Sequence, residues 1–396
     1  MTDKQQAVII FNAGSSSLKF GLYAIHDNKP ACMTQGEIEN LGNESPDNQA
    51  KFSVYGSNTP TQLLALTTHE QAITCILERV EKDYPQLQLA GAGHRVVHGG
   101  CKFSTPVLIN TRIRQQLQDY SHLAPLHMPH NLAAIDALQQ QRPELQQVAC
   151  FDTAFHRTMP DYEQHYALPP VWFERGVQHY GFHGLSYEYI ASVLPEYAGS
   201  SADAKVIVAH LGHGASLCAM VQRKSVATTM GFTPLDGIPM ATRPGALDPG
   251  VISWLIREAG LSIEQVDELL NQQCGLYGLS GISGDMRKLL ADKHTEASRA
   301  IDYFVHHTQR AIASLAAAIG GIDVLVFTAG IGENSALIRE RICRQAAWLG
   351  IQIDTDANNN NHRQISSASS NVTILRIPTD EEMIIAKHTL RLITQL

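Results

Sequence analysis

The sequence predicts an α/β protein built from two copies of one unit. Strand-like runs alternate with helical patterns along the chain, which is typical of α/β folds. With 396 residues, the chain is long enough for two domains of about 150 to 200 residues each. Two pairs of similar segments also recur in the same order in its two halves.

The first half predicts a hairpin, a helix and a strand, in that order. VIIFNAGSSSLKFGLY, residues 8–23, is a run of strand-forming residues that breaks at Asn12-Ala13-Gly14, passes three serines and resumes. Because Asn, Gly and Ser favour turns, this pattern predicts a β-hairpin. Apolar spacing at 71–84 then predicts a helix. AGAGHRVVHGG, residues 90–100, predicts a strand that ends in glycines.

The second half repeats this order. VIVAHLGHGASLCAMV at 206–221 again predicts two strands around a glycine turn. Residues 298–320 predict a helix, and IDVLVFTAGIGENS at 322–335 predicts a strand followed by a glycine turn. Chance similarity could explain one pair of segments, but both pairs in the same order favour duplication. Two such units would form a clamp for a nucleotide.

Composition and charge exclude several classes of protein. Hydrophobic residues make up 44% and charged residues 17% of the chain, an ordinary globular balance. The net charge of −8 and the lack of a basic tract argue against a nucleic-acid partner. Scattered cysteines without a C-x-x-C pair favour reduced thiols, and the sequence shows no signal-peptide core or membrane span. These features predict a cytoplasmic protein without a membrane partner.

Three glycine turns follow predicted strands, in AGSSS, HLGHGAS and TAGIGENS. Glycine has no Cβ, so backbone N–H groups can approach phosphate oxygens, and Lys19 adds a cation beside the first turn. None of the turns completes a P-loop or the dinucleotide fingerprint, which disfavours a Rossmann dehydrogenase.

Several charged residues stand alone in apolar or glycine-rich stretches. Each could be a structural ion pair or, for Asp152 before Thr-Ala, a helix cap. Taken together, Arg95, His183 and Arg243 form a cationic set suited to a transferring phosphoryl group. The histidine pairs in HRVVH and HMPH lack the helical arrangement of zinc sites, so carboxylate-held Mg²⁺ accompanying ATP fits the sequence better.

Ordered motifs over essentially the whole chain resemble the acetate kinase family of short-chain carboxylate kinases: NAGSSSLKF, GHRVVHGG, LAPLH, FDTAFH, YGFHGLSY, HLGHGAS, GFTPLDG, TRPGALDPG, GISGDMR and TAGIGENS. That family is similar to the sugar kinase, Hsp70 and actin superfamily, whose duplicated actin-like (ribonuclease H-like) domains clamp ATP. The resemblance implies an N-terminal actin-like domain at 1–150, with a C-terminal helix at 384–396 packing back on it, and a C-terminal actin-like nucleotide-binding domain at 151–383. It also suggests a homodimer.

The resemblance implies four groups of site residues. Mg²⁺ would be held by Asn12 and Glu381, with Glu382 as the fallback. Among the catalytic residues, Arg95 would bind the substrate carboxylate, and His183 and Arg243 would stabilise the transition state, with His127 nearby. Asp152 is the fifth residue of this group. The nucleotide would be bound by Lys19, His210, Leu211, Gly212, His213, Gly214, Asp285, Met286, Arg287, Gly330, Ile331, Gly332, Glu333 and Asn334. The substrate pocket would consist of Arg95 with Val97, Leu126, Phe182 and Pro234.

The family usually gives a proton-handling role to the aspartate that matches Asp152. A carboxylic acid substrate, with a pKa of about 4 to 4.5, is already ionised at neutral pH, so no proton needs removing before attack. We therefore expect Asp152 to orient Mg²⁺ or an arginine. The harder task is to bring two anions together, and Arg95, Arg243, His183 and Mg²⁺ would offset their charge.

The expected activity is reversible, direct in-line phosphoryl transfer from Mg-ATP to acetate, giving acetyl phosphate and ADP. Val97 fills space that a longer acid would need, which favours acetate. One methylene is worth only about 1 to 3 kcal/mol in such a pocket, so a propionate or butyrate kinase is the nearer alternative. The other alternative is a non-catalytic ATP-switched module like Hsp70 or actin, which has no need of a carboxylate site.

Four residues depart from the family pattern: Met128, His213, Ala227 and Ala246. None of them is a residue implied to be catalytic. A histidine near phosphate anions is expected to have a raised pKa, so His213 would make ATP affinity depend on pH.

Overall fold

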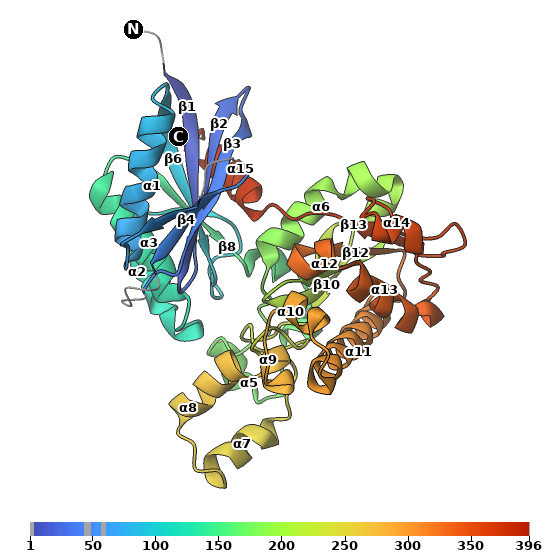
Figure 1. Ribbon diagram of the computed structural model, residues 1–396. Helices are drawn as coiled ribbons and strands as arrows, with labels where there is room; N and C mark the ends of the chain where they lie inside the picture. The colour runs from blue at the N-terminus through green and yellow to red at the C-terminus, as the bar shows by residue number, and fades with distance from the viewer. Residues whose placement is uncertain (1–3, 43–48, 57–60, 396) are drawn as a thin grey trace. The chain divides into compact units, whose positions relative to one another are not determined.

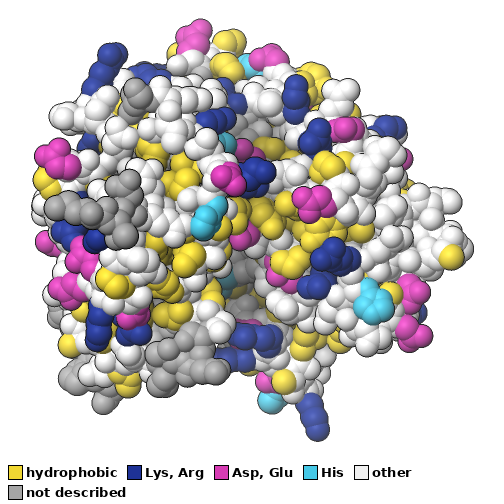
Figure 2. Space-filling model, turned by 90° about the horizontal axis from the view of Figure 1, so that it is seen from above, with side chains coloured by type: hydrophobic (Ala, Val, Ile, Leu, Met, Phe, Trp, Pro, Cys, Tyr) yellow, Lys and Arg dark blue, Asp and Glu magenta, His cyan; other side chains and the backbone are white. Residues whose placement is uncertain are grey.

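Figure 1 shows the computed structural model, which describes residues 4–42, 49–56 and 61–395. The chain separates into two compact units. Unit 1 comprises Met1–Ala154 and Asp380–Leu396, and unit 2 comprises Phe155–Thr379. Among the described residues, no helix is both long and apolar enough to cross a membrane. Lys and Arg side chains are interspersed with Asp and Glu side chains over the face shown in Figure 2.

Unit 1 contains an eight-stranded sheet in the order β5-β4-β3-β2-β1-β6-β8-β7. The strands are β1 (Gln5–Ala13), β2 (Ser17–His26), β3 (Lys29–Glu39), β4 (Ala50–Val54), β5 (Gln62–Leu64), β6 (Leu87–Val96), β7 (Val107–Leu108) and β8 (Gln147–Phe151). The helices are α1 (His69–Asp83), α2 (Thr111–Asp119), α3 (Met128–Gln141) and α15 (Glu381–Ile393). The hairpin predicted at 8–23 and the helix predicted at 71–84 are both present.

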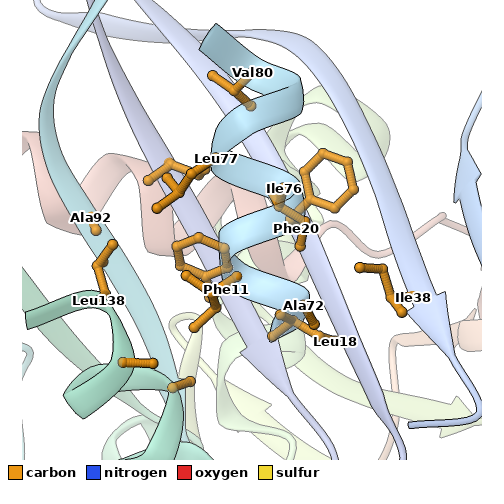
Figure 3. Close-up of a cluster of buried hydrophobic side chains, with 14 of the residues drawn as sticks. Phe11, Leu18, Phe20, Ile38, Ala72, Ile76, Leu77, Val80, Ala92 and Leu138 are labelled. Atoms are coloured by element: carbon orange, nitrogen blue, oxygen red, sulfur yellow. The ribbon is translucent and has the colours of Figure 1, made fainter. Parts of the chain in front are cut away.

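The core of unit 1 forms where α1 covers the sheet. Thr68 caps the helix in a capping box with Gln71, and buried apolar residues then recur every three or four positions. Figure 3 shows Ile76 and Leu77 of α1 beside Phe11, and the cluster continues through Phe20 and Ile38 on the neighbouring strands. Each such side chain contributes about 1.5 to 3 kcal/mol by burial.

Helix α15 packs on the strands of unit 1 although it ends the chain. A Cβ at Gly93 of β6 would lie 2.3 Å from Thr389 Oγ1 and 2.5 Å from Ile385 Cγ2. Glycine at this position is therefore what allows α15 to pack so closely against the sheet. The helix begins at Glu381, earlier than the predicted residue 384.

Unit 2 contains a five-stranded sheet in the order β11-β10-β9-β12-β13. Its strands are β9 (Lys205–Leu211), β10 (Ala215–Val221), β11 (Lys224–Thr228), β12 (Val324–Thr328) and β13 (Thr373–Arg376). Its helices are α4 (Asp161–Gln164), α5 (Pro170–Glu174), α6 (Gly184–Ala198), α7 (Pro249–Arg257), α8 (Ile263–Glu268), α9 (Gly275–Ser280), α10 (Met286–Ala291), α11 (Thr295–Ala318), α12 (Ala329–Asn334), α13 (Ala336–Gln345) and α14 (Thr355–Asn359).

The two sheets share one five-strand pattern. In unit 1, β1 pairs antiparallel with β2 and parallel with β6, and in unit 2, β9 pairs antiparallel with β10 and parallel with β12. The next strands outward match as well. β3 pairs antiparallel with β2 as β11 does with β10, and β8 pairs parallel with β6 as β13 does with β12. The predicted duplicated α/β fold is confirmed, and the similar segments 8–23 and 206–221 are equivalent hairpins.

One predicted glycine turn is wrong. TAGIGENS does not form an open turn, because helix α12 follows β12 directly. The backbone turns at Ala329, which adopts a φ of +64°, and the Glu333 carboxylate accepts the Ala329 N–H at 2.8 Å. This side-chain bond satisfies a backbone donor at the helix start and so favours the helix.

The buried His156 should make the fold sensitive to acid. Its Nε2–H donates to Phe182 O and its Nδ1 lies 2.9 Å from Ser225 Oγ. Burial lowers its pKa from 6.5 to about 4, so between these values the unfolded chain binds more protons than the folded one. Stability is therefore lost as pH falls through this window. We expect this residue to lower the free energy of unfolding by about 2 kcal/mol between pH 7 and pH 5.

Urea denaturation of the wild type and of His156→Asn at both pH values measures this contribution. The variant should lose less stability than the wild type on acidification. An equal loss in both proteins would contradict the assignment.

Candidate functional site

In unit 1, predicted site residues gather where β1, β2 and β6 meet the adjoining turns. The β1–β2 register places Asn12 opposite Lys19, and residues directly opposite each other share a face of the sheet. Arg95, near the end of β6, donates from Nη1 to Asn12 Oδ1 at 3.1 Å. Three strands thus bring an amide and two cations together.

Asp152, just after β8, holds the guanidinium of Arg95. Arg95 Nε donates to Asp152 Oδ1 at 3.0 Å and Nη2 donates to Oδ2 at 2.5 Å. Asp152 is 1% exposed, so this bidentate pair is largely shielded from water. Burial lowers the pKa of Arg95, but Asp152 and Glu381 raise it by more, and the guanidinium stays charged. The sequence left two structural alternatives for Asp152, an ion pair or a helix cap, and the structure shows the ion pair.

The start of α15 adds two carboxylates to this cluster. Glu381 Oε2 lies 3.8 Å from Arg95 Nε, and Asn12 Nδ2 donates to Glu382 Oε1 at 3.4 Å. Burial, reinforced by Asp152 and Glu382, raises the pKa of Glu381 to about 7, although Arg95 and Lys19 oppose the shift. The raised pKa reflects mainly the burial of this carboxylate and, after it, the neighbouring carboxylates, and a divalent cation would favour the ionised form.

These donors suit Mg²⁺ better than a metal that needs a complete protein cage. Among the described residues, no group of three or more His, Cys, Asp or Glu side chains is arranged to hold a metal ion. Mg²⁺ usually keeps several waters and takes one or two protein carboxylates together with substrate phosphates. The oxygens of Asn12, Glu381 and Glu382 fit that requirement.

A residue that the sequence analysis missed connects two of the strand ends. Asn131 of α3 is buried, donates from Nδ2 to Ala13 O at 2.8 Å and accepts from Val97 N at 3.0 Å. It thereby fixes the turn after β1 relative to the end of β6. In the sequence, Asn131 could have been noticed as a polar side chain next to Leu132, in a segment whose other buried positions are mostly apolar.

The predicted substrate-pocket residues are divided between the units. In unit 1, Val97 is buried, Leu126 is 45% exposed, and His127 occupies the N-cap position of α3. In unit 2, Phe182 is buried and Pro234 O accepts a hydrogen bond from Arg243 Nη1 at 2.8 Å.

In unit 2, two predicted catalytic side chains converge on the turn between β9 and β10. A Cβ at Gly214 would lie 2.7 Å from Arg243 Nη2 and 3.1 Å from His183 Nε2, so a side chain at this position would displace the Arg243 guanidinium from its present place. His183 has a φ of +57° and stacks on His210 with ring centroids 4.3 Å apart. A non-glycine residue in this left-handed conformation is strained, which is a frequent feature of functional sites.

His213 lies in the same turn. Burial and the Arg243 cation lower its pKa, and Asp285 opposes them only in part. These effects favour the neutral imidazole. The rise in pKa expected beside phosphate anions stays a prediction.

Of the remaining predicted nucleotide residues, Leu211 ends β9 and Gly212 follows it in the turn. Asp285, Met286 and Arg287 lie at the start of α10, and residues 330–334 make up most of α12. Asp285 caps α10 by accepting from Arg287 N, while the Arg287 side chain is exposed and Met286 is buried. In α12, Glu333 Oε1 accepts from Ala329 N and also, at 3.1 Å, from Thr379 N.

A second residue that was not predicted from the sequence stabilises α12 by hydrogen bonds to its backbone. Arg339 of α13 is fully buried and donates to Gly332 O, Glu333 O and the side chain and backbone of Asn358, at 2.7 to 3.0 Å. Burial and Arg376 lower its pKa to about 10. No pattern in the sequence distinguishes it from the other arginines of this amphipathic helix.

A large cavity of unit 1 lies away from the predicted site residues. Its volume is about 690 Å³, and its apolar lining includes Val80, Tyr84, Leu87, Leu89 and Leu145. Leu87 and Leu89 lie at the beginning of β6, whereas Arg95 lies near the end of the same strand.

Comparisons with known proteins agree with this fold and with the sequence motifs. The model of the acetokinase family matches residues 7–387. An acetate kinase of Rhodopseudomonas palustris is 47% identical over 97% of this chain and 98% of its own length. An acetate kinase of Rickettsia prowazekii is 39% identical over 98% and 99% of the two chains.

Solved structures give the same result. A propionate kinase from Francisella tularensis superposes with a TM-score of 0.90 at 36% identity, covering 98% of this chain and 99% of its own. An acetate kinase from Porphyromonas gingivalis has a TM-score of 0.86 at 35% identity, with the same coverage. The predicted family, its kinase class and the duplicated actin-like fold are therefore confirmed: this chain belongs to the acetokinase family.

Proposed function

We propose that this protein transfers the γ-phosphoryl group of ATP directly and reversibly to acetate, giving acetyl phosphate and ADP. The observation that carries the proposal is the Arg95 guanidinium, which is held by a buried carboxylate and stays charged. A fixed guanidinium suits a carboxylate substrate, whereas an ATP-switched module has no need of one. Close relatives named acetate kinase support the choice of acetate.

We propose Mg²⁺ as the metal, held by Asn12 and Glu381 with Glu382 as the alternative to Glu381. When bound, it would neutralise phosphate charge. The support is the donor chemistry and the raised pKa of Glu381, which indicates a site that gains from an added cation.

In this proposal the chain's own residues divide the work of bringing two anions together. Arg95 binds the substrate carboxylate, and Asp152 orients Arg95 rather than removing a proton, because acetate is already ionised at neutral pH. His183 and Arg243 donate hydrogen bonds to the phosphoryl oxygens, on which negative charge develops during the transfer, and His127 is assigned to the same step.

The remaining predicted residues are assigned to substrate binding. The nucleotide residues are Lys19, His210, Leu211, Gly212, His213, Gly214, Asp285, Met286, Arg287, Gly330, Ile331, Gly332, Glu333 and Asn334. Val97, Leu126, Phe182 and Pro234 are assigned to binding the acyl group.

We propose two actin-like domains, predicted at 1–150 with 384–396 and at 151–383. These bounds differ by four residues at each boundary from the two compact units of the structure. We also propose a homodimer, as the family resemblance suggests, and a cytoplasmic location, where ATP is available and the seven cysteines, present here as thiols, stay reduced.

Trapping acyl phosphate with hydroxylamine tests the proposed reaction. Purified protein with Mg-ATP should give product with acetate, less with propionate and butyrate, and none without an acid. EDTA should abolish product formation, and added Mg²⁺ should restore it.

Propionate is the second candidate substrate, because one of the most similar solved structures is a propionate kinase. A higher kcat/KM for propionate would keep the reaction and overturn the choice of acetate. ATP binding without product from any acid would instead favour the non-catalytic module.

A further inference from the structure

Behind His183 lies a chain of buried hydroxyl groups that no predicted role uses. His183 Nδ1 lies 2.8 Å from Ser216 Oγ on β10, and Ser216 Oγ lies 2.5 Å from the hydroxyl of Tyr187 on α6. Ser216 and Tyr187 are fully buried. Two elements of unit 2 therefore meet at the ring nitrogen of His183 that faces away from Gly214.

The direction of these hydrogen bonds follows from the need to satisfy each buried proton. Burial raises the pKa of Tyr187 well above its ordinary value, so the phenol keeps its proton. Among the described residues, Ser216 Oγ is the hydrogen-bond partner of that phenol, so Tyr187 must donate to Ser216. Ser216 is then left to donate its own proton to His183 Nδ1.

This direction decides which nitrogen of His183 carries a proton. An Nδ1 that accepts from Ser216 is unprotonated, so the ring proton lies on Nε2, the atom 3.1 Å from the Cβ position at Gly214. A doubly protonated ring would leave the Ser216 proton without an acceptor. It would also place a second cation beside Arg243, whose Nη2 approaches the same point.

We propose that Tyr187 and Ser216 are positioning residues that hold His183 as a neutral imidazole with its proton on Nε2, aimed at the Gly214 turn. In that form His183 donates a hydrogen bond to the phosphoryl group and accepts no proton from a substrate. The inference rests on the proposed phosphoryl transfer for its consequence in catalysis, but not for the protonation of the ring.

Nitrogen NMR of the ¹⁵N-histidine-labelled protein at pH 8 measures this protonation directly, with the His183 signals assigned by their loss in His183→Gln. The expected spectrum has a protonated Nε2 and an unprotonated Nδ1 in the wild type, and a mixture of tautomers in Ser216→Ala. A proton on Nδ1 in the wild type would overturn the proposal.

Kinetics separate positioning from general destabilisation. Ser216→Ala should lower kcat about tenfold and Tyr187→Phe about threefold, with each KM changed less than about twofold, because the transition-state contact is affected more than ground-state binding. Ser216→Thr, which keeps the hydroxyl, should restore most of kcat.

Matched controls exist in the same unit. Ser225→Ala removes a buried serine that contacts His156, and Tyr180→Phe removes a buried phenol that donates to Gly176 O. Both should retain wild-type kcat, and an equal loss of kcat in the controls would overturn the positioning role. If the wild type forms no acyl phosphate from any acid, the proposed function fails, while the NMR result still decides the protonation of His183.

Discussion

Arg95→Ala should lower kcat/KM for acetate by about 10³-fold or more, the largest effect on activity that we expect. The substitution removes the proposed carboxylate-binding group and leaves Asp152 buried without its cation. Because breaking a buried ion pair exposes the remaining charge to an apolar environment, unit 1 should also lose about 3 to 5 kcal/mol of stability. Arg95→Lys should recover part of the stability but little activity, since an ammonium cannot reproduce the bidentate contact with Asp152.

Arg114→Ala provides the matched control for this prediction. Arg114 also binds an aspartate of unit 1 with two hydrogen bonds, to Asp136, but the pair is partly exposed. Exposed pairs contribute about 0 to 1 kcal/mol, so this variant should keep its activity and nearly all its stability. Hydroxylamine assays and urea denaturation of the three variants measure both effects. Turnover of Arg95→Ala within a few-fold of the wild type would disprove the assigned role.

Arg339→Met should destabilise unit 2 by about 3 to 5 kcal/mol, the largest effect on stability outside the proposed site. The methionine would fill much of the space, but the carbonyl groups of Gly332, Glu333 and Asn358 would lose their donor inside the protein. Two of these carbonyls belong to α12. The KM for ATP should therefore rise as well, because α12 carries predicted nucleotide-binding residues.

The control for Arg339 lies on the same helix. Arg344 forms an exposed i,i+4 pair with Glu340, and Arg344→Met should change stability by about 0.5 kcal/mol or less. Thermal and urea denaturation of both variants, followed by ATP titration, make the comparison. Similar stability losses at positions 339 and 344 would contradict the prediction that the buried hydrogen bonds of Arg339 stabilise unit 2.

The sequence predicted the parts of the site that depend on local chemistry. The glycine turn between β9 and β10, the hairpin containing Asn12 and Lys19, and the cationic character of Arg95 are all readable from short segments. The start of α12 was not predictable in this way. It depends on the Glu333 side chain reaching back to Ala329 N, and the glycines of TAGIGENS indicate a turn equally well.

By itself, the sequence determined the duplicated α/β fold, because strand and helix periodicity and turn composition act over a few residues and recur in both halves. The family was indicated by the resemblance of its ordered motifs. Only the tertiary structure decided the partners of the charged and polar groups. Arg95 meets Asp152 from a distance of 57 residues along the chain, and Asn12 meets Glu382 across 370. Similarly, Tyr187 and Ser216 reach His183 from different elements. Many carboxylates and hydroxyls could have filled these positions, and the choice among them depends on which strand ends and helices pack together, because burial decides which polar groups must find partners.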